Sequence, residues 1–371
     1  MTRLTRRLLA ALMLCAAHAT WAAPADDCRR DLDELPGFML ENDAGGKDLL
    51  ERQGAAHLDD ALTSARTAAA AIHTDDDCGP ILAAYLRAWR STHLWIEPAS
   101  NHATAQQATG TGDDPRLPTL RVLSRRTVLL TLRSFNAKVG EALVALLTAQ
   151  RRVLESHPDW IVDVRDNNGG MDFSFQPLMP WLVANGSVAM GVRVHVTPAN
   201  IAGWQKSCDS FTTLVAECQH TMGAVVQRMQ AARPGDDVSP YHDGNGITYT
   251  DATAAPGKRP ARVAILIDKP CGSSCEEFLL EARQGFAVKL VGRRTYGGLD
   301  YSNLRPHELP SGHWRLWYAT TRSLRIPDLP VDGIGVLPDI YLPLVPGDTP
   351  ADEIERTRRW LEGGTLAPLP H

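Results

Sequence analysis

Two blocks of short apolar strands and helices most constrain the fold of this chain of 371 residues. Near-continuous apolar strands separated by helices indicate a sheet covered by helices. The expected strands and helices of the two blocks are strand 127–132, helix 138–157 and strand 160–164, then strand 262–268, helix 274–284 and strand 287–292. We therefore expect an α/β core.

The segments around these blocks differ from them in composition. Residues 23–117 begin with apolar positions at helical spacing, as in Ile81–Trp89, and end in a polar stretch over 98–117 without an apolar period. We expect an N-terminal helical region and linker over 23–117 and a core over 118–345. The core contains an irregular insertion at about 186–257, and a C-terminal tail follows over 346–371.

The N-terminus has the pattern of a secretory signal peptide over residues 1–22. Basic residues precede a short apolar run, and small residues follow near Ala19 and Ala22. The run is too short to span a bilayer, and no later window has the roughly 20 apolar residues that a membrane helix needs. Lipoprotein processing at Cys15 is disfavoured, because the preceding Leu-Met-Leu lacks the usual small residue. We expect an exported chain, periplasmic or secreted, without a membrane span.

Six cysteines remain after such a cleavage: Cys28, Cys78, Cys208, Cys218, Cys271 and Cys275. An even number in an exported chain is typical of disulfide bonds. Proximity favours Cys208 with Cys218 and Cys271 with Cys275, which leaves Cys28 with Cys78, although the sequence does not fix the connectivity. Buried free thiols are the alternative.

Charge and missing motifs exclude several classes of function. The formal net charge of −5 becomes three units more negative without the arginines of the signal peptide, which argues against a nucleic-acid partner. The chain has no His-Glu-x-x-His, Cys-x-x-Cys, P-loop or Gly-x-Gly-x-x-Gly motif, so metal hydrolase, kinase and dinucleotide-binding functions lack support. We expect no metal and no organic cofactor, and the sequence does not indicate the oligomeric state.

Two loops at the ends of apolar strands are candidates for chemistry. In the first, Asp163–Gly170, the adjacent Gly169 and Gly170 allow the approach of main-chain N–H groups that an oxyanion hole needs, although Asn-Gly-Gly is also a common turn. In the second, Ser273 lies at the start of a helix, where the dipole favours negative charge. Ser273 with Glu276 also fits a capping box, so this loop alone does not decide between the two roles.

The order of these pieces resembles the tail-specific, or C-terminal processing, serine peptidases and their relatives, the tricorn core peptidases. In that superfamily a strand ends in Asp-Leu-Arg-Gly-Asn-x-Gly-Gly, which residues 163–170 match. Ser273, Glu276 and Phe278 match the later Ser-x-x-Glu-x-Phe. Val291–Gly297 matches Val-Gly-x-x-Thr-x-Gly, and Gly335–Asp339 matches Gly-x-x-Pro-Asp. The resemblance covers residues 126–345 and implies that Ser273 is a nucleophile.

The chain departs from the tail-specific branch at the general base. That branch has a lysine just after Thr-x-Gly, where this chain has Gly298. The tricorn-like branch instead uses a histidine before the core, in a segment like Asp-x-His-Thr, and His93 takes that place with Ser91 in the position of the aspartate. A neutral imidazole with a pKa of about 6.5 can accept a serine proton at neutral pH. We therefore expect His93 to be the base.

The resemblance also implies the remaining members of the site. A carboxylate three residues before Gly335 would orient the base, and this residue is Asp332, with Glu276 as its rival. The oxyanion hole would be formed by the N–H of Ser274 and one from Gly169 or Gly170.

The implied fold is a crotonase- or ClpP-like α/β core, with mixed sheets covered by helices, next to the N-terminal helical region. The implied function is an exported serine endopeptidase that hydrolyses peptide bonds through an acyl-enzyme on Ser273, with a protein or peptide as its substrate. The tail-specific relatives usually carry a PDZ domain, and no such pattern is evident here. The alternative is a non-catalytic ligand- or peptide-binding protein on the same fold, because fold does not settle function.

Overall fold

The computed structural model describes residues 23–99, 114–184, 186–209, 215–240, 246–250 and 257–367. The predicted signal peptide, residues 1–22, and most of the predicted linker lie outside the described residues. Within the described ranges, no helix is both long and apolar enough to cross a membrane.

The α-helices of the described residues are α1 (Pro24–Asn42), α2 (Gly46–Gln53), α3 (Ala55–Ala69), α4 (Cys78–Trp89), α6 (Ala137–Ala149), α7 (Arg151–Ser156), α8 (Met179–Leu182), α9 (Pro198–Gln205), α10 (Val215–Ala231), α11 (Ser274–Ala282) and α12 (Pro350–Leu361). The short 3-10 turns are η1 (Asp75–Asp77), η3 (Asp172–Ser174) and η4 (Gln176–Leu178). The strands are β1 (Trp95–Pro98), β2 (Thr119–Val122), β3 (Thr127–Thr131), β4 (Asp159–Asp163), β5 (Ser187–Met190), β6 (Val192–His195), β7 (Asp237–Val238), β8 (Ile247–Thr250), β9 (Arg262–Ile267), β10 (Val288–Gly292), β11 (Tyr301–Glu308), β12 (Trp314–Ser323) and β13 (Ile340–Tyr341).

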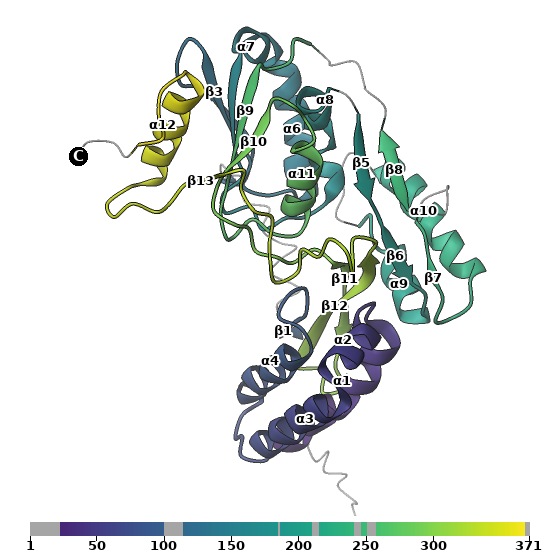
Figure 1. Ribbon diagram of the computed structural model, residues 1–371. Helices are drawn as coiled ribbons and strands as arrows, with labels where there is room; N and C mark the ends of the chain where they lie inside the picture. Colours follow the sequence, from purple (N-terminus) through teal and green to yellow (C-terminus); the bar gives the residue numbers. More distant parts are fainter. Residues whose placement is uncertain are drawn as a thin grey trace, which may run out of the picture.

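The predicted α/β core is confirmed as a six-stranded sheet in the order β13-β10-β9-β4-β3-β2. Strands β3, β4, β9, β10 and β13 are parallel, and β2 is antiparallel to β3. Alternate residues of one strand face opposite sides. In β4, Trp160 and Val162 pack with α6, α7 and α11, whereas Ile161 packs on the other side with Leu361 of α12. Figure 1 shows α6, α8 and α11 on one face of the sheet and α12 on the other.

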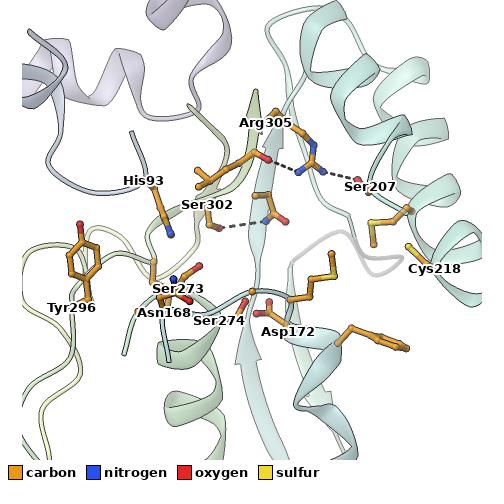
Figure 2. Close-up of a pocket in the computed structure, with 18 of the residues that line it drawn as sticks. His93, Asn168, Asp172, Ser207, Cys218, Ser273, Ser274, Tyr296, Ser302 and Arg305 are labelled. Atoms are coloured by element: carbon orange, nitrogen blue, oxygen red, sulfur yellow. Dashed lines mark hydrogen bonds between the residues drawn. The ribbon is translucent and has the colours of Figure 1, made fainter. Parts of the chain in front are cut away.

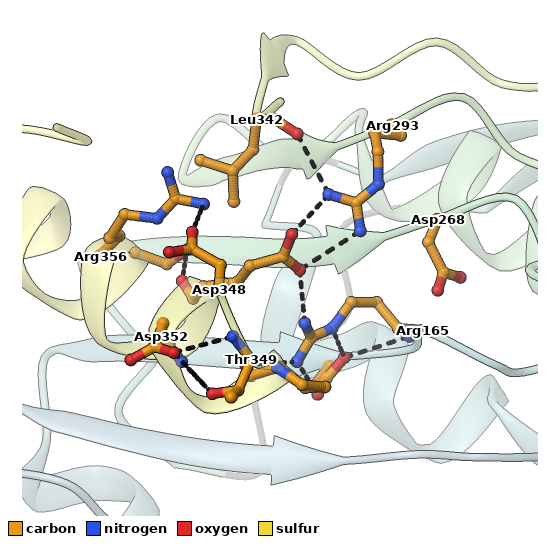
Figure 3. A network of polar contacts seen from close by, with 12 residues as sticks. Arg165, Asp268, Arg293, Leu342, Asp348, Thr349, Asp352 and Arg356 are labelled. Carbon is orange, nitrogen blue, oxygen red and sulfur yellow. Dashed lines mark hydrogen bonds and ion pairs between the residues drawn. The ribbon is translucent and has the colours of Figure 1, made fainter. Parts of the chain in front are cut away.

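The predicted C-terminal tail contains the helix that covers the second face of this sheet. A network of ion pairs fixes α12 to the sheet (Figure 3). Glu353 of α12 lies 2.6 Å from both Arg165, after β4, and Arg293, after β10. Arg356 of the same helix pairs with Asp348 at 2.7 Å. The apolar side of α12 and these buried charges together anchor residues that sequence inspection assigned to a tail.

A second, antiparallel sheet has the strand order β1-β12-β6-β7, with β11 paired to β12. Helices α1 to α4 pack against it and have no separate core, because Leu32, Leu82 and Trp89 share one apolar cluster with Leu316 and Tyr318 of β12. The helical region is therefore continuous in space with strands that lie beyond residue 300, although the predicted boundary is at residue 117.

The predicted insertion at 186–257 forms a third part of the structure, in addition to the core and the second sheet with its helices. Its strands β6 and β7 extend the second sheet, β5 pairs with β8, and α9 packs with α10 through Trp204, Val225 and Met229. The favoured cysteine pairing is present in full. Its three bonds are Cys28–Cys78, Cys208–Cys218 and Cys271–Cys275, with Cα–Cα distances of 5.6, 5.8 and 5.5 Å.

Candidate active site

A pocket of about 850 Å³ lies where the α/β core, the second sheet and the insertion meet. Both predicted catalytic loops open into it, and so does His93 (Figure 2). Residues from the three parts that line it include Asn168, Gly170, Ser273 and Ser274 of the core, His93, Ser302, Asn303 and Arg305 of the second sheet and its approach, and Ser207, Cys218 and Met222 of the insertion.

Ser273 is held in a strained backbone conformation at the turn from β9 into α11. Its φ is 57° and its ψ is −127°. A non-glycine residue rarely has a positive φ, and such strain clusters at functional sites. The described residues contain three other non-glycine residues with positive φ, and two of them, His93 and Asn303, line the same pocket.

The glycine loop after β4 supports the turn that carries Ser273. Gly169 has a φ of +95°, and a Cβ there would lie 2.6 Å from the Gly272 carbonyl oxygen and 2.8 Å from the Ser273 Cβ. The N–H of Gly272 donates to the carbonyl of Asn167 at 3.2 Å. Only glycine allows this close approach of the two loops.

The same loops provide main-chain donors near Ser273. The N–H of Gly169 is used inside its loop, because it donates to Oδ1 of Asn167 at 2.9 Å. Among the hydrogen bonds of the described residues, the N–H groups of Gly170 and Ser274 have no partner, and both residues line the pocket. Of the two glycines considered from the sequence, Gly170 is therefore the one with an N–H free to bind a developing oxyanion.

His93 lies in the short segment between α4 and β1, and its ring is directed toward Ser273 (Figure 2). Its Nδ1 is 2.6 Å from the carbonyl oxygen of Tyr301. Arg90 fixes the segment, since it donates to the carbonyl oxygens of Thr92 at 2.7 Å and His93 at 3.0 Å. Arg90 is itself paired with the buried Asp43 at 2.9 Å. The ring therefore occupies a rigid position.

The electrostatic surroundings of His93 favour the neutral ring. Burial lowers the pKa of His93, and the charge of Arg90 acts in the same direction. The Tyr301 carbonyl and the charge of Asp332 oppose this change without reversing it. No hydrogen bond joins Ser273 to His93 among those of the described residues. Such contacts are often long before substrate binds.

Asp332 is linked to the segment of His93 through a hydrogen bond with the preceding residue, Thr92. Its Oδ2 accepts a hydrogen bond from the Thr92 hydroxyl at 3.0 Å, and its Oδ1 accepts from the N–H groups of Leu299 and Asp300 at 2.6 and 2.7 Å. The expected direct contact with the imidazole is taken by the Tyr301 carbonyl instead. Asp332 thus acts on His93 by its charge and by holding Thr92.

Glu276 is fully buried, and no hydrogen bond joins its carboxylate to His93 among those of the described residues. Its two oxygens accept hydrogen bonds from Thr295 Oγ1 and the Gly297 N–H at 2.5 and 2.7 Å, and from the Gly298 and Ser273 N–H groups at 2.9 and 3.2 Å. Burial raises the pKa of Glu276, while these donors lower it. The carboxylate therefore ties the loop at 295–298 to the start of α11, where it takes part in a capping box with Ser273.

Gly298, at the position of the lysine in the tail-specific branch, has no room for a side chain. A Cβ there would lie 2.9 Å from the ring of Tyr296 and 3.2 Å from the Cβ of Thr92, the residue before His93. The segment that carries His93 thus packs against the position from which a lysine would extend.

Several pocket residues have no motif that could reveal them in the sequence. Arg305, Ser207 and Asp172 are isolated polar residues in otherwise unremarkable segments. Burial raises the pKa of Asp172, although a hydrogen bond from the Ser274 side chain and the charge of Arg325 oppose this change. One cluster of the described residues, Asp27, Asp75 and His313, could hold a metal ion. It does not line the pocket.

The sequence model of peptidase family S41 matches residues 126–342, more than half of the chain. The chain belongs to peptidase family S41. As a member of this family it is a serine peptidase that acts on protein substrates, and the matched region contains the glycine loop, the Ser273 loop and Asp332.

Solved structures show the same fold as this S41 peptidase at low sequence identity. Mature CPAF is 10% identical with a TM-score of 0.61, over 93% of this chain and 100% of that chain. Mature CPAF complexed with lactacystin is 10% identical with a TM-score of 0.59, over 86% and 94%. A lipoprotein from Streptococcus agalactiae is 14% identical with a TM-score of 0.51, over 94% and 99%. No curated protein matches the chain.

Proposed function

We propose that this S41 peptidase is an exported serine endopeptidase in which Ser273 is the nucleophile and His93 is the general base. The observation that carries this proposal is the convergence, in one pocket, of a strained serine at a helix start, a histidine directed toward it and two main-chain N–H groups that have no partner among the described residues. These are the parts that acyl transfer needs.

The tautomer of His93 follows from its partner. A carbonyl oxygen only accepts hydrogen bonds, so Nδ1 carries the hydrogen in the contact with Tyr301. In the neutral ring Nε2 is then unprotonated, and it is the nitrogen available to take a proton. The lowered pKa of His93 keeps this form populated at neutral pH.

In the proposed reaction the hydroxyl proton of Ser273 passes to Nε2 of His93 while Oγ forms a bond to the peptide carbonyl carbon. The N–H groups of Gly170 and Ser274 bind the oxyanion. The intermediate collapses when the C–N bond breaks, and His93 donates the proton to the leaving amine. Water then gives a proton to Nε2 of His93 and forms a bond to the acyl carbon; the C–Oγ bond breaks, His93 returns the proton to Ser273 Oγ, and the acid product leaves.

Asp332 has a supporting role in this proposal. The imidazolium formed in each step gains stability from the negative charge of Asp332, which raises the pKa of His93. Its hydrogen bond to Thr92 also fixes the segment that carries the base. Glu276 orders the loop at 295–298 and acts on Ser273 only through the main chain.

Export is proposed from two features. The first 22 residues have the pattern of a signal peptide, and the described chain carries three disulfide bonds, which persist in oxidising compartments. N-terminal sequencing of the mature protein should give a start at Thr20 or Ala23. A mature protein that begins at Met1 would contradict the proposal of export.

The catalytic assignment is tested with a fluorophosphonate probe, which forms a covalent bond with an activated serine, and with an unfolded protein as substrate. Ser273→Ala should abolish labelling and cleavage, and His93→Gln should lower both by at least about 10³-fold. Ser64→Ala, at an exposed site on α3, is the matched control.

Each other outcome rejects a stated part of the proposal. Loss of labelling in Ser274→Ala but not in Ser273→Ala would make Ser274 the nucleophile. Full activity in His93→Gln would remove His93 as the base. A wild-type protein that binds peptides without labelling or cleavage would support the binding function instead.

A further inference from the structure

Arg305, on β11, lies in the wall of the pocket next to the insertion (Figure 2). Its Nη2 donates to Ser207 Oγ at 2.7 Å and its Nη1 donates to the Leu304 carbonyl at 2.8 Å. Its guanidinium carbon lies 4.7 Å from the ring centre of Trp204. Gly203 leaves room for the Arg305 side chain, because a Cβ there would lie 2.8 Å from its methylene carbons. The guanidinium group is thus built into the wall and held in place.

Among the ion pairs of the described residues, none joins a carboxylate to Arg305, and no carboxylate is among the groups that affect its pKa. Its Nε is buried without a hydrogen-bond partner. Burial lowers the pKa of Arg305 to about 10, with only Tyr318 opposing this change, so the group is still charged at neutral pH. The segment at 210–214, which follows the Ser207 region and lies outside the described residues, contains no acidic residue in its sequence.

The buried arginines of the described chain have the carboxylate partner that Arg305 lacks. Each has a carboxylate within ion-pair distance: Arg90 with Asp43, Arg165 with Asp163, Arg315 with Glu308, Arg325 with Glu277 and Arg356 with Asp348. A charge removed from water carries a large desolvation penalty, which these pairs offset. Among the described residues Arg305 has no such compensation, and it faces a pocket that a ligand can enter.

We propose that Arg305 is a specificity residue that binds a carboxylate of the peptide substrate. This inference rests on the proposed function of the pocket and deepens it. A guanidinium group presents parallel N–H donors that match the two oxygens of a carboxylate. The carboxylate belongs either to an Asp or Glu side chain or to the free C-terminus of the substrate, because both present the same group.

The position of Arg305 in the pocket places this carboxylate away from the scissile bond. Figure 2 shows Arg305 at the side of Ser207 and Cys218, with Ser302 between it and the His93–Ser273 pair. Asp172, the acidic residue of the lining, lies on the Ser274 side. A peptide with its anionic group at Arg305 therefore keeps its negative charge apart from that of Asp172.

The test compares matched peptides by kcat/KM. One series replaces a single internal Gln by Glu at successive positions from the cleaved bond, and the other changes a C-terminal amide to the free acid. We expect the acidic form to be preferred by about 10- to 100-fold in one of the series, as for hydrogen bonds to charged groups. Glu preference alone assigns a side chain, and acid over amide alone assigns the C-terminus.

Variants then connect the preference to Arg305. Arg305→Gln should remove the preference, Arg305→Lys should keep part of it, and Arg121→Gln, at an exposed position on β2, should keep all of it. Labelling of Ser273 by the fluorophosphonate probe should be unchanged in Arg305→Gln, because the probe makes no use of a remote carboxylate. Absence of any preference in the wild type, or its full retention in Arg305→Gln, would overturn the inference.

Stability and binding give two readouts that separate this inference from the proposed function. Arg305→Met should unfold at a temperature equal to or above that of the wild type, since it removes an uncompensated charge; a fall in Tm together with an unchanged preference would assign a purely structural role. Ser273→Ala should still bind the acidic peptide about tenfold or more tightly than its neutral counterpart in calorimetry. If the wild type never labels but Ser273→Ala shows this difference, carboxylate binding stands and the peptidase mechanism fails.

Discussion

The Nδ1 atom of His93 lies 2.6 Å from the carbonyl oxygen of Tyr301. A main-chain carbonyl thus holds the ring at the nitrogen that, in a Ser-His-Asp triad, is held by a side-chain carboxylate. Because a carbonyl carries no net charge, it fixes the tautomer but stabilises the imidazolium less than a carboxylate in direct contact would. The charge of Asp332, which acts on the ring from behind Thr92, supplies part of that difference.

The pH dependence of kcat/KM should reveal the environment of His93. The base must be neutral to act, and burial lowers its pKa. Activity should therefore persist below the ordinary histidine value of about 6.5 and fall only at more acidic pH. The profile is measured with a peptide that lacks ionisable groups in this range. An acid limb at or above pH 7 would contradict the assignment.

Asp332→Asn should shift that limb in a defined direction. The carboxylate of Asp332 raises the pKa of His93, so its removal should lower that pKa further and move the acid limb to lower pH. We expect kcat to fall about tenfold, equivalent to about 1.4 kcal/mol, because the imidazolium loses a favourable charge. The amide oxygen can still accept from the Leu299 and Asp300 N–H groups, so the fold should be kept. A limb that moves upward would reject this role.

Gly169→Ala should inactivate the enzyme without unfolding it. The added methyl would meet the Gly272 carbonyl and Ser273 Cβ and displace the nucleophile. Gly54→Ala is the matched control, because Gly54 has a similar φ of +83° and nothing within 4 Å of the added Cβ. Probe labelling and circular dichroism of both variants check the prediction. Equal labelling of the two would show that contact with the glycine loop does not position Ser273.

Removal of either of two disulfides should have different effects on stability and activity, because the two bonds close loops of very different lengths. Cys28 and Cys78 are 50 residues apart, so replacing both by serine should lower the free energy of unfolding by about 4 kcal/mol, with labelling retained while the protein is folded. Cys271 and Cys275 are four residues apart and bracket Ser273. Their double replacement should cost about 2 kcal/mol but reduce labelling strongly. Denaturation curves and labelling rates distinguish the two effects.

The sequence was most informative where short motifs recur in a fixed order. The loops of Ser273 and Gly170, the absence of a lysine at Gly298 and His93 as the candidate base were all predicted in this way, and the α/β core was predicted from the apolar strands. The partner of His93 could not be found, since any residue can offer a carbonyl. The separate roles of Asp332 and Glu276 depend on which main-chain donors the loop at 295–300 turns toward each of them.

Helix α12 and the role of Arg305 were not predicted from the sequence, for two different reasons. Helix α12 could have been recognised, because Thr349 and Asp352 form a capping box before an amphipathic stretch. Arg305 could not, because what distinguishes it is the lack of a partner in space, and a sequence does not display that.

The proposed nucleophile and the proposed base belong to different parts of the fold. Ser273 follows β9 of the parallel sheet, whereas His93 follows α4, whose apolar residues pack with those of β12 in the second sheet. A chain whose N-terminal helices have not yet docked would have the proposed nucleophile without the proposed base beside it. Under the proposed mechanism, hydrolytic activity therefore depends on docking of the N-terminal helices as well as on folding of the core that carries the serine.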